Sequence, residues 1–145
     1  MIKTIFILIL AVVLGFVCFA QADFEQEVVA ATLIMEAGGE YHKGSMEAVY
    51  EVIHNRAKKR RSTYVDECLR HLQFSCWNNI KVEDGIKKAS KHPRWNEALI
   101  ITYSKSKTNY TKGADHYHAD YVNPYWNKKM KKTTKIGQHI FYKGR

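Results

Sequence analysis

Glu36 is the residue of this 145-residue chain whose position most favours acid–base chemistry. It is the only ionisable side chain between Val28 and Gly39, and Thr32 is the only other polar residue of that run before the glycines. Apolar surroundings and the negative end of a helix dipole both disfavour a carboxylate. If burial dominates, we expect Glu36 to keep its proton near neutral pH and to serve as a general acid.

A second interpretation of Glu36 is structural. The residue falls in the last turn of the expected helix, where its carboxylate could face water or pair with Arg56 or a lysine. Two glycines should break the helix before Glu40, so a pair of carboxylates on one helix face is not expected. A glycosidase that uses water normally needs a second carboxylate, for which Asp115 and Asp120 are candidates by composition only. A lone acid is sufficient if a hydroxyl group of the sugar itself attacks the anomeric carbon and gives an anhydro product.

The segment 115–120, with the sequence Asp-His-Tyr-His-Ala-Asp, is the other candidate for chemistry. On an extended strand His116 and His118 point to one face, as two metal ligands could, and a nearby aspartate could complete a zinc site. Two histidines without a third ligand at a defined spacing are weak evidence for a metal site, because most histidines lie on the surface or form hydrogen bonds. Several aromatic residues in and after this segment could stack on sugar rings or form a local core: Tyr117, Tyr121, Tyr125 and Trp126.

Length and composition limit the class of protein. The chain is 46% hydrophobic and 26% charged, with only 8 Gly and 2 Pro, which indicates one small globular domain rather than a disordered or repetitive chain. The 23 Lys and Arg exceed the 14 Asp and Glu, for a formal charge of +9. Such a charge favours anionic partners, among which wall polymers, lipid headgroups and nucleic acid cannot be separated by charge alone.

The N-terminal segment has the layout of a secretory signal peptide. Lys3 precedes an uncharged run from Thr4 to Ala20, and Ala20-Gln21-Ala22 places small residues at the −3 and −1 positions of a cleavage site. We expect a signal peptide over 1–22 and a catalytic domain over 23–145. A retained membrane anchor is the alternative. Removal of the segment leaves 22 basic and 14 acidic residues, a charge of +8.

Cys68 and Cys76 are the only cysteines that remain after such cleavage. An even number of cysteines in an oxidising compartment predicts a disulfide, here closing a loop of about nine residues. The alternative is a pair of free buried thiols.

Hydrophobic periodicity predicts a mainly helical chain. We expect helices over 24–37, over about 45–60, over about 64–72 and from about Pro93 onward, and a short strand pair over 136–143. The helix over 45–60 has an apolar face at helical spacing, formed by Met46, Val49, Tyr50, Ile53 and Ala57. The fold class is therefore α+β, with a minor β element near the C-terminus.

Five segments of the chain, taken in order, are similar to the motifs of one known protein family. They span 31–40, which includes Glu36, and then 48–56, 73–77, 113–126 and 136–142. Together they resemble the SleB-type cell wall hydrolase family, whose typical member is a spore-cortex-lytic enzyme. Any one segment is a weak match, but five in order are specific and cover nearly all of the chain after residue 22.

The resemblance implies a small lysozyme-like or lytic-transglycosylase-like domain that cleaves the glycan strands of peptidoglycan, with Glu36 as the catalytic acid. It places Gln73, His116, Tyr117 and Tyr121 in the substrate-binding cleft, and it implies no cofactor and no metal. Gly38 departs from the family pattern, because an arginine is common at that position. No separate wall-binding domain is visible, so we expect the positive surface to attract the wall instead.

We therefore expect a peptidoglycan lytic transglycosylase or muramidase that acts between N-acetylmuramic acid and N-acetylglucosamine. We expect an exported monomer in the periplasm, the wall or the medium, with no nucleic-acid partner. One alternative is a zinc-dependent wall amidase or peptidase that uses His116 and His118, which chelation would inhibit. Another is a non-catalytic basic module that binds the wall and releases no muropeptides.

Overall fold

A computed structural model describes residues 24–105 and 108–144. The predicted signal peptide over 1–22 and its cleavage site lie outside the described residues. Within these two ranges no helix is both long enough and apolar enough to span a bilayer.

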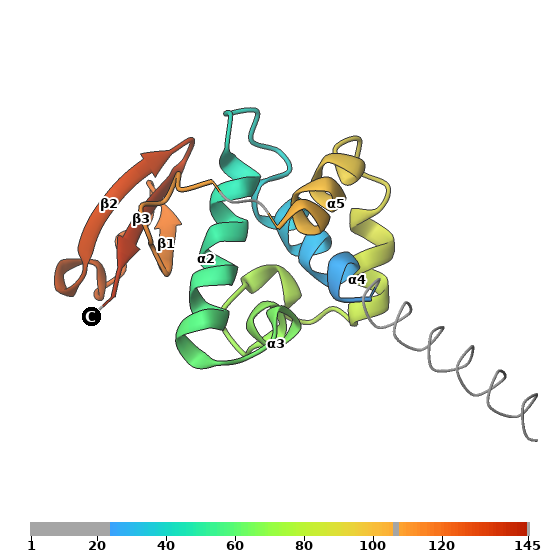
Figure 1. Cartoon of the computed structure of the whole chain (residues 1–145), viewed down its shortest axis with the longest axis horizontal. Coiled ribbons are helices and arrows are strands. Elements are labelled where there is room, and N and C mark those ends of the chain that lie inside the picture. The colour runs from blue at the N-terminus through green and yellow to red at the C-terminus, as the bar shows by residue number, and fades with distance from the viewer. Residues whose placement is uncertain (1–23, 106–107, 145) are drawn as a thin grey trace, which may run out of the picture.

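The described chain is an α+β domain, which confirms the predicted fold class. Figure 1 shows α2 between the sheet on one side and the remaining helices on the other. A first helix covers 24–37. It is followed by α2 (Ser45–Arg60), α3 (Tyr64–Leu69), η1 (Ser75–Trp77), α4 (Val82–Ala89), α5 (Trp95–Ser104), β1 (His116–Ala119), η2 (Asn127–Lys129), β2 (Lys131–Ile136) and β3 (His139–Lys143).

The helix boundaries follow local sequence signals. The first helix ends at residue 37, as the following glycines predict, and α2 has the predicted bounds. Gly44 precedes α2 with a φ of 85°, a conformation that glycine adopts without strain. A capping box between Thr63 and Asp66 starts α3, which ends three residues earlier than expected.

The core is built around the first helix and α2. The predicted apolar face of α2 is buried throughout, and it packs against Val29, Leu33 and other residues of the first helix. A second face of α2 carries Ala48 and Val52, which pack against the sheet residue Phe141. The half-buried Tyr117 packs against both clusters, so β1 lies where the helices and the sheet meet.

The sheet is antiparallel with the strand order β1-β3-β2. The predicted strand pair is the β2–β3 hairpin, whose turn contains Gly137 at a φ of 55°. The sequence did not predict β1, and of β2 it predicted only Ile136, because the lysines and threonines of β2 give little apolar alternation. An irregularity between Lys132 and Thr134 disturbs the pattern further.

The short segment before α4 is attached to the first helix by Trp77. Its indole Nε1 donates a hydrogen bond to the Thr32 hydroxyl at 3.0 Å, and Thr32 in turn donates to the Val28 carbonyl. Gly85 allows α4 to approach, because a Cβ there would lie 2.4 Å from a Trp77 ring carbon. This packing explains why α4, which was not predicted, forms in a short polar sequence.

Cys68 and Cys76 are free cysteines in the structure, so the predicted disulfide is absent and this prediction is corrected. Burial raises the pKa of Cys68 to about 12 and also raises the pKa of Cys76. The negative charge of the Glu36 carboxylate raises the pKa of Cys76 further. Since oxidation proceeds through the thiolate, protonated thiols in these environments are poorly reactive.

The loop that connects α5 to the sheet is held by a buried carboxylate on α2. Glu51 Oε1 accepts hydrogen bonds from the Thr108 hydroxyl and the Tyr110 backbone N–H. Its Oε2 accepts from the backbone N–H and the hydroxyl of Thr111. These four bonds fix the chain immediately before β1, which carries the residues of the site described below.

Asp115 holds β1 against the end of α2 and the C-terminal residues. Its carboxylate accepts hydrogen bonds from Gly144 N at 2.7 Å, His116 Nδ1 at 2.8 Å and Lys59 Nζ at 2.9 Å. Burial alone would raise the pKa of Asp115, but these three donors outweigh it and lower the pKa to about 2.

This lowered pKa predicts an acid-dependent loss of stability. The charged form of Asp115 stabilises the fold above the unfolded-state pKa near 4, and the contribution, about 2 kcal/mol, is lost as the pH falls toward 2. Denaturant unfolding should therefore show Asp115→Asn to be less stable than the wild type at pH 6 and nearly equal to it at pH 2. An equal difference at both pH values would contradict this assignment.

Candidate active site

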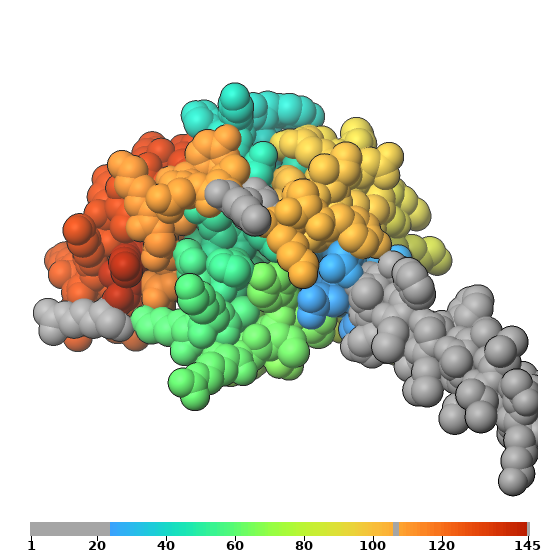
Figure 2. Space-filling model, viewed as in Figure 1, coloured from blue at the N-terminus to red at the C-terminus, as the bar shows by residue number. Residues whose placement is uncertain are grey.

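A cavity of about 560 Å³ lies where the C-terminal end of the first helix faces the β2–β3 turn. In the space-filling view the residues that follow the first helix stand between the sheet and the α4–α5 region (Figure 2). The cavity is lined by Met35, Glu36, Gly39, Glu40, Tyr41, His42, Ala119, Tyr121, Gly137, Gln138 and His139. Its size suits one or two sugar rings.

Glu36 is half-buried and lines this cavity, rather than facing bulk water from a frayed helix end. Its Oε2 accepts a hydrogen bond of 2.6 Å from the Tyr117 hydroxyl. The guanidinium of Arg56, the alternative partner considered from the sequence, instead donates through Nε to the Asp115 carbonyl. One oxygen of Glu36 is thus fixed by Tyr117, and the Cys76 thiol also interacts with the Glu36 carboxyl group at the edge of the cavity.

Tyr117 is well suited to hold Glu36 in place. Burial and the adjacent Glu36 carboxylate raise the pKa of Tyr117 well above its ordinary value, so the hydroxyl stays protonated and donates. Its ring packs edge-on against His139 at 4.9 Å and beside Phe141 at 5.5 Å between ring centres. A side chain confined in this way orients the carboxyl group that it binds.

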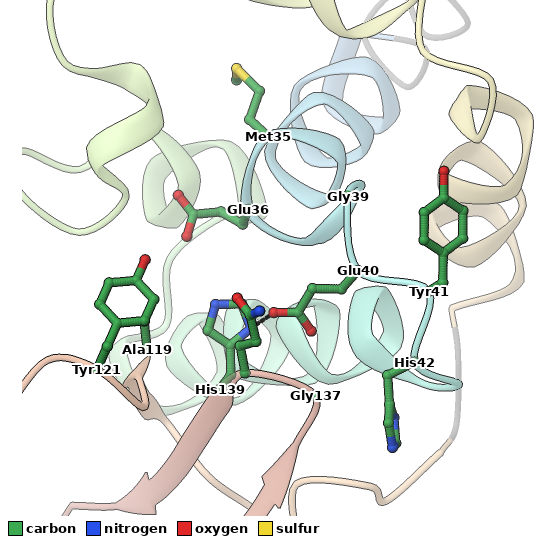
Figure 3. A pocket seen from close by; sticks show the side chains of 11 residues that line it. Met35, Glu36, Gly39, Glu40, Tyr41, His42, Ala119, Tyr121, Gly137 and His139 are labelled. Atoms are coloured by element: carbon green, nitrogen blue, oxygen red, sulfur yellow. Dashed lines mark ion pairs between the residues drawn. The ribbon is translucent and has the colours of Figure 1, made fainter.

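Glu40 is a second carboxylate in the same cavity, which the sequence analysis did not expect. The helix breaks after residue 37 as predicted, but the chain turns so that Glu40 faces the cavity (Figure 3). Ser45 Oγ donates to Glu40 Oε2 at 3.0 Å, and His139 Nδ1 lies 3.2 Å from Oε1. A Cβ on Gly137 would lie 2.1 Å from Oε2, so a larger residue at this turn would displace the carboxylate from its position.

Two exposed tyrosines border the cavity. Tyr41 is 88% exposed and Tyr121 is 81% exposed, and Figure 3 shows them on opposite sides of Glu36, Glu40 and His139. Large exposed aromatic rings beside a polar cavity are typical of surfaces that stack on sugars.

The aspartates considered as second carboxylates lie elsewhere. Asp115 is bound by Lys59, His116 and Gly144, as described above. Asp120 forms an ion pair with Lys135 at 2.7 Å, which lowers the pKa of Asp120. Neither residue lines the cavity that contains Glu36.

The four residues expected in a substrate cleft are not all brought together. Tyr121 borders the cavity, and Tyr117 does not line it but donates a hydrogen bond to Glu36, which does. Gln73 lies outside the cavity, with its side-chain oxygen 3.5 Å from Arg60 Nη1. His116 is also outside it, bonded to Asp115 and packed against Trp126.

His116 and His118 form part of an aromatic cluster rather than a set of metal ligands. Both rings lie 5.5 Å from the Trp126 ring, on one side of β1 as expected. His118 Nδ1 donates to the Ala119 carbonyl, so its Nε2 accepts from the Tyr142 hydroxyl. Among residues 24–105 and 108–144, no three His, Cys, Asp or Glu side chains are grouped as a metal site would require.

Three cavity residues were missed because their roles depend on tertiary structure: Glu40, Tyr41 and His139. Each lies in or next to a segment that carries the family resemblance, but no spacing in the sequence indicates that the loop after the first helix meets the β2–β3 turn. The glycine of that turn was the available signal, since a required glycine often marks close approach of another group.

Comparison with known proteins identifies the family. The family model described as "Cell Wall Hydrolase" matches residues 39–142, which is more than half of the chain. The match includes Glu40, Tyr117, Tyr121 and His139 and begins three residues after Glu36. No curated protein and no solved structure that was compared gives a significant match. The chain therefore belongs to the cell wall hydrolase family and is an enzyme of peptidoglycan hydrolysis.

Proposed function

We propose that the protein cleaves the glycan strands of peptidoglycan between N-acetylmuramic acid and N-acetylglucosamine, with Glu36 as general acid and base. The observation that carries this proposal is the Glu36 carboxyl group, which faces a sugar-sized cavity while Tyr117 holds one of its oxygens. Family membership supports peptidoglycan as the substrate. The position of Glu36 at a sugar-sized cavity supports a reaction in which an acid and base group acts on a sugar.

In the proposed reaction, Glu36 donates its proton through Oε1 to the glycosidic oxygen as the bond to the anomeric carbon breaks. The N-acetylglucosamine leaves as an alcohol, and positive charge develops on the muramyl ring. Glu36, now a carboxylate, then takes the proton of the nucleophile that attacks the anomeric carbon. If the muramyl 6-hydroxyl attacks, the product is a 1,6-anhydro sugar, and if water attacks, it is a reducing end.

Glu40 and Tyr117 assist this chemistry in different ways. The Glu40 carboxylate is held by a hydrogen bond from Ser45, so it would provide a fixed negative charge in the cavity in which the sugar ring becomes positive. Tyr117 keeps Glu36 oriented toward that cavity. Tyr41 and Tyr121 are placed to stack on the sugar rings next to the bond that is cleaved.

Export and attraction to the wall complete the proposal. We propose that residues 1–22 direct export and that the protein acts as a monomer. The charge of +8 that remains would draw it to anionic wall polymers, and raised salt should then weaken its binding to sacculi.

Peptidoglycan strands from which the peptides have been removed test the type of bond that is cleaved. We expect the enzyme to shorten these peptide-free strands, and to do so equally with and without EDTA. An amidase or a peptidase has no bond to cleave in this substrate. Intact strands after incubation with enzyme that is active on whole sacculi would overturn the proposal. If EDTA also inhibited the activity on sacculi, the result would indicate the zinc-dependent alternative.

A further inference from the structure

A second cavity, of about 520 Å³, lies beside the first on the α4–α5 side of the first helix. Met35 lines both cavities, so they adjoin at the residue that precedes Glu36. Cys76 also lines the second cavity, and its thiol lies close enough to the Glu36 carboxylate for that charge to contribute to the rise in the Cys76 pKa. A ligand of the second cavity would therefore lie next to the reacting bond.

The two cavities differ in charge. The first contains the carboxylates of Glu36 and Glu40, whereas the described chain places no acidic residue in the lining of the second. Lys88 and Lys91 line the second cavity, both are exposed, and neither has an ion-pair partner among residues 24–105 and 108–144. Two unpaired ammonium groups beside a catalytic cavity favour a ligand with carboxylates.

His92 adds a directed hydrogen-bond donor to this cavity. Its Nδ1 accepts a hydrogen bond of 3.2 Å from the Arg94 backbone N–H, so in the neutral ring Nε2 carries the hydrogen. The rest of the lining includes the apolar side chains of Ile34, Met35 and Ala89. The cavity thus combines a small apolar surface with three cationic or donating groups.

We propose that this second cavity binds the peptide stem of the muramic acid residue at the cleavage site. Lys88, Lys91 and His92 would contact the carboxylates of the stem, and the apolar surface would accept its alanine methyl group. This inference rests on the proposed glycan cleavage and extends it, because recognition of the stem would set the direction in which a strand crosses Glu36. Strands that carry peptides would then be preferred to bare ones.

The double variant Lys88→Glu/Lys91→Glu tests this proposal. Its control is Lys131→Glu/Lys132→Glu, which makes the same change of charge at exposed positions of β2. On peptide-bearing strands we expect the first variant to have a KM about tenfold above that of the control, since two exposed charge contacts are lost. On strands stripped by an amidase the two variants should have equal KM values.

The outcomes separate the possible explanations. An equal KM for both variants on peptide-bearing strands would overturn the proposal. A tenfold difference on both kinds of strand would also overturn it, since the lysines would then act on a part of the strand that does not depend on the peptide stem. If the wild type leaves stripped strands intact, the glycan cleavage proposed above fails instead.

A binding measurement gives a readout that does not require cleavage. Titration with muramyl dipeptide, N-acetylmuramyl-L-alanyl-D-isoglutamine, should shift the NMR signals of the Ala89 and His92 amides in the wild type. The shifts should be absent in Lys88→Glu/Lys91→Glu and absent when N-acetylmuramic acid replaces the dipeptide. Unchanged signals with the dipeptide, or equal shifts with N-acetylmuramic acid, would contradict recognition of the stem.

Discussion

Glu36→Gln should reduce the rate of glycan cleavage by about 1,000-fold while the protein stays folded, because a positioned general acid commonly contributes a factor of this size. Glutamine keeps the shape of the side chain and can still accept the hydrogen bond from the Tyr117 hydroxyl, but it has no proton to donate. The rate is measured as the appearance of new glycan ends from purified sacculi. Folding is measured by circular dichroism and the thermal midpoint.

Glu83→Gln is the matched control for this variant. Glu83 is an exposed residue in the first turn of α4, so the same chemical change there removes a charge without entering the cavity. Its activity should stay within about twofold of the wild type. Should Glu36→Gln retain a rate close to that of the control, Glu36 would not be the catalytic acid.

Tyr117→Phe should lower kcat by about 10- to 100-fold, since a hydrogen bond to a charged group contributes on the order of 1.5–3 kcal/mol. The phenylalanine ring preserves the packing against His139 and Phe141 and removes only the hydroxyl that holds Glu36. Steady-state kinetics on soluble glycan strands separate the effect on kcat from the effect on KM. Because Tyr117 contacts the acid rather than the substrate, KM should change little.

Tyr125→Phe controls for the loss of a tyrosine hydroxyl. Tyr125 is 84% exposed and does not line the cavity of Glu36. Both variants should have the same thermal midpoint within a few degrees. If Tyr117→Phe raised KM and left kcat unchanged, Tyr117 would be a substrate-binding residue, as the family resemblance first implied.

The parts of the fold that were predictable depend on local sequence. The run of apolar residues before Glu36 and the glycines after it define the first helix, and the periodic apolar face of α2 defines the second. Both signals act over a few turns and need no distant partner. Glu36 could be singled out for the same reason, because an isolated acid in an apolar helix is visible in the sequence itself.

The rest of the site depends on contacts between distant segments. Glu40 reaches the cavity because Ser45, Gly137 and His139 meet it from α2 and from the β2–β3 hairpin. Tyr117 reaches Glu36 across more than 80 positions of the chain. The even number of cysteines did not predict their free state for a similar reason. The burial of Cys68 and the proximity of Cys76 to Glu36 are properties of the folded chain.

Mass spectrometry of the fragments released from intact sacculi tests the central claim most directly. The account predicts fragments with new glycan ends at muramic acid and with peptide stems still attached, released by the wild type and not by Glu36→Gln. An anhydro end, one water lighter than a reducing end, would identify attack by the muramyl hydroxyl. Fragments with uncut glycan and freed peptides would contradict the account.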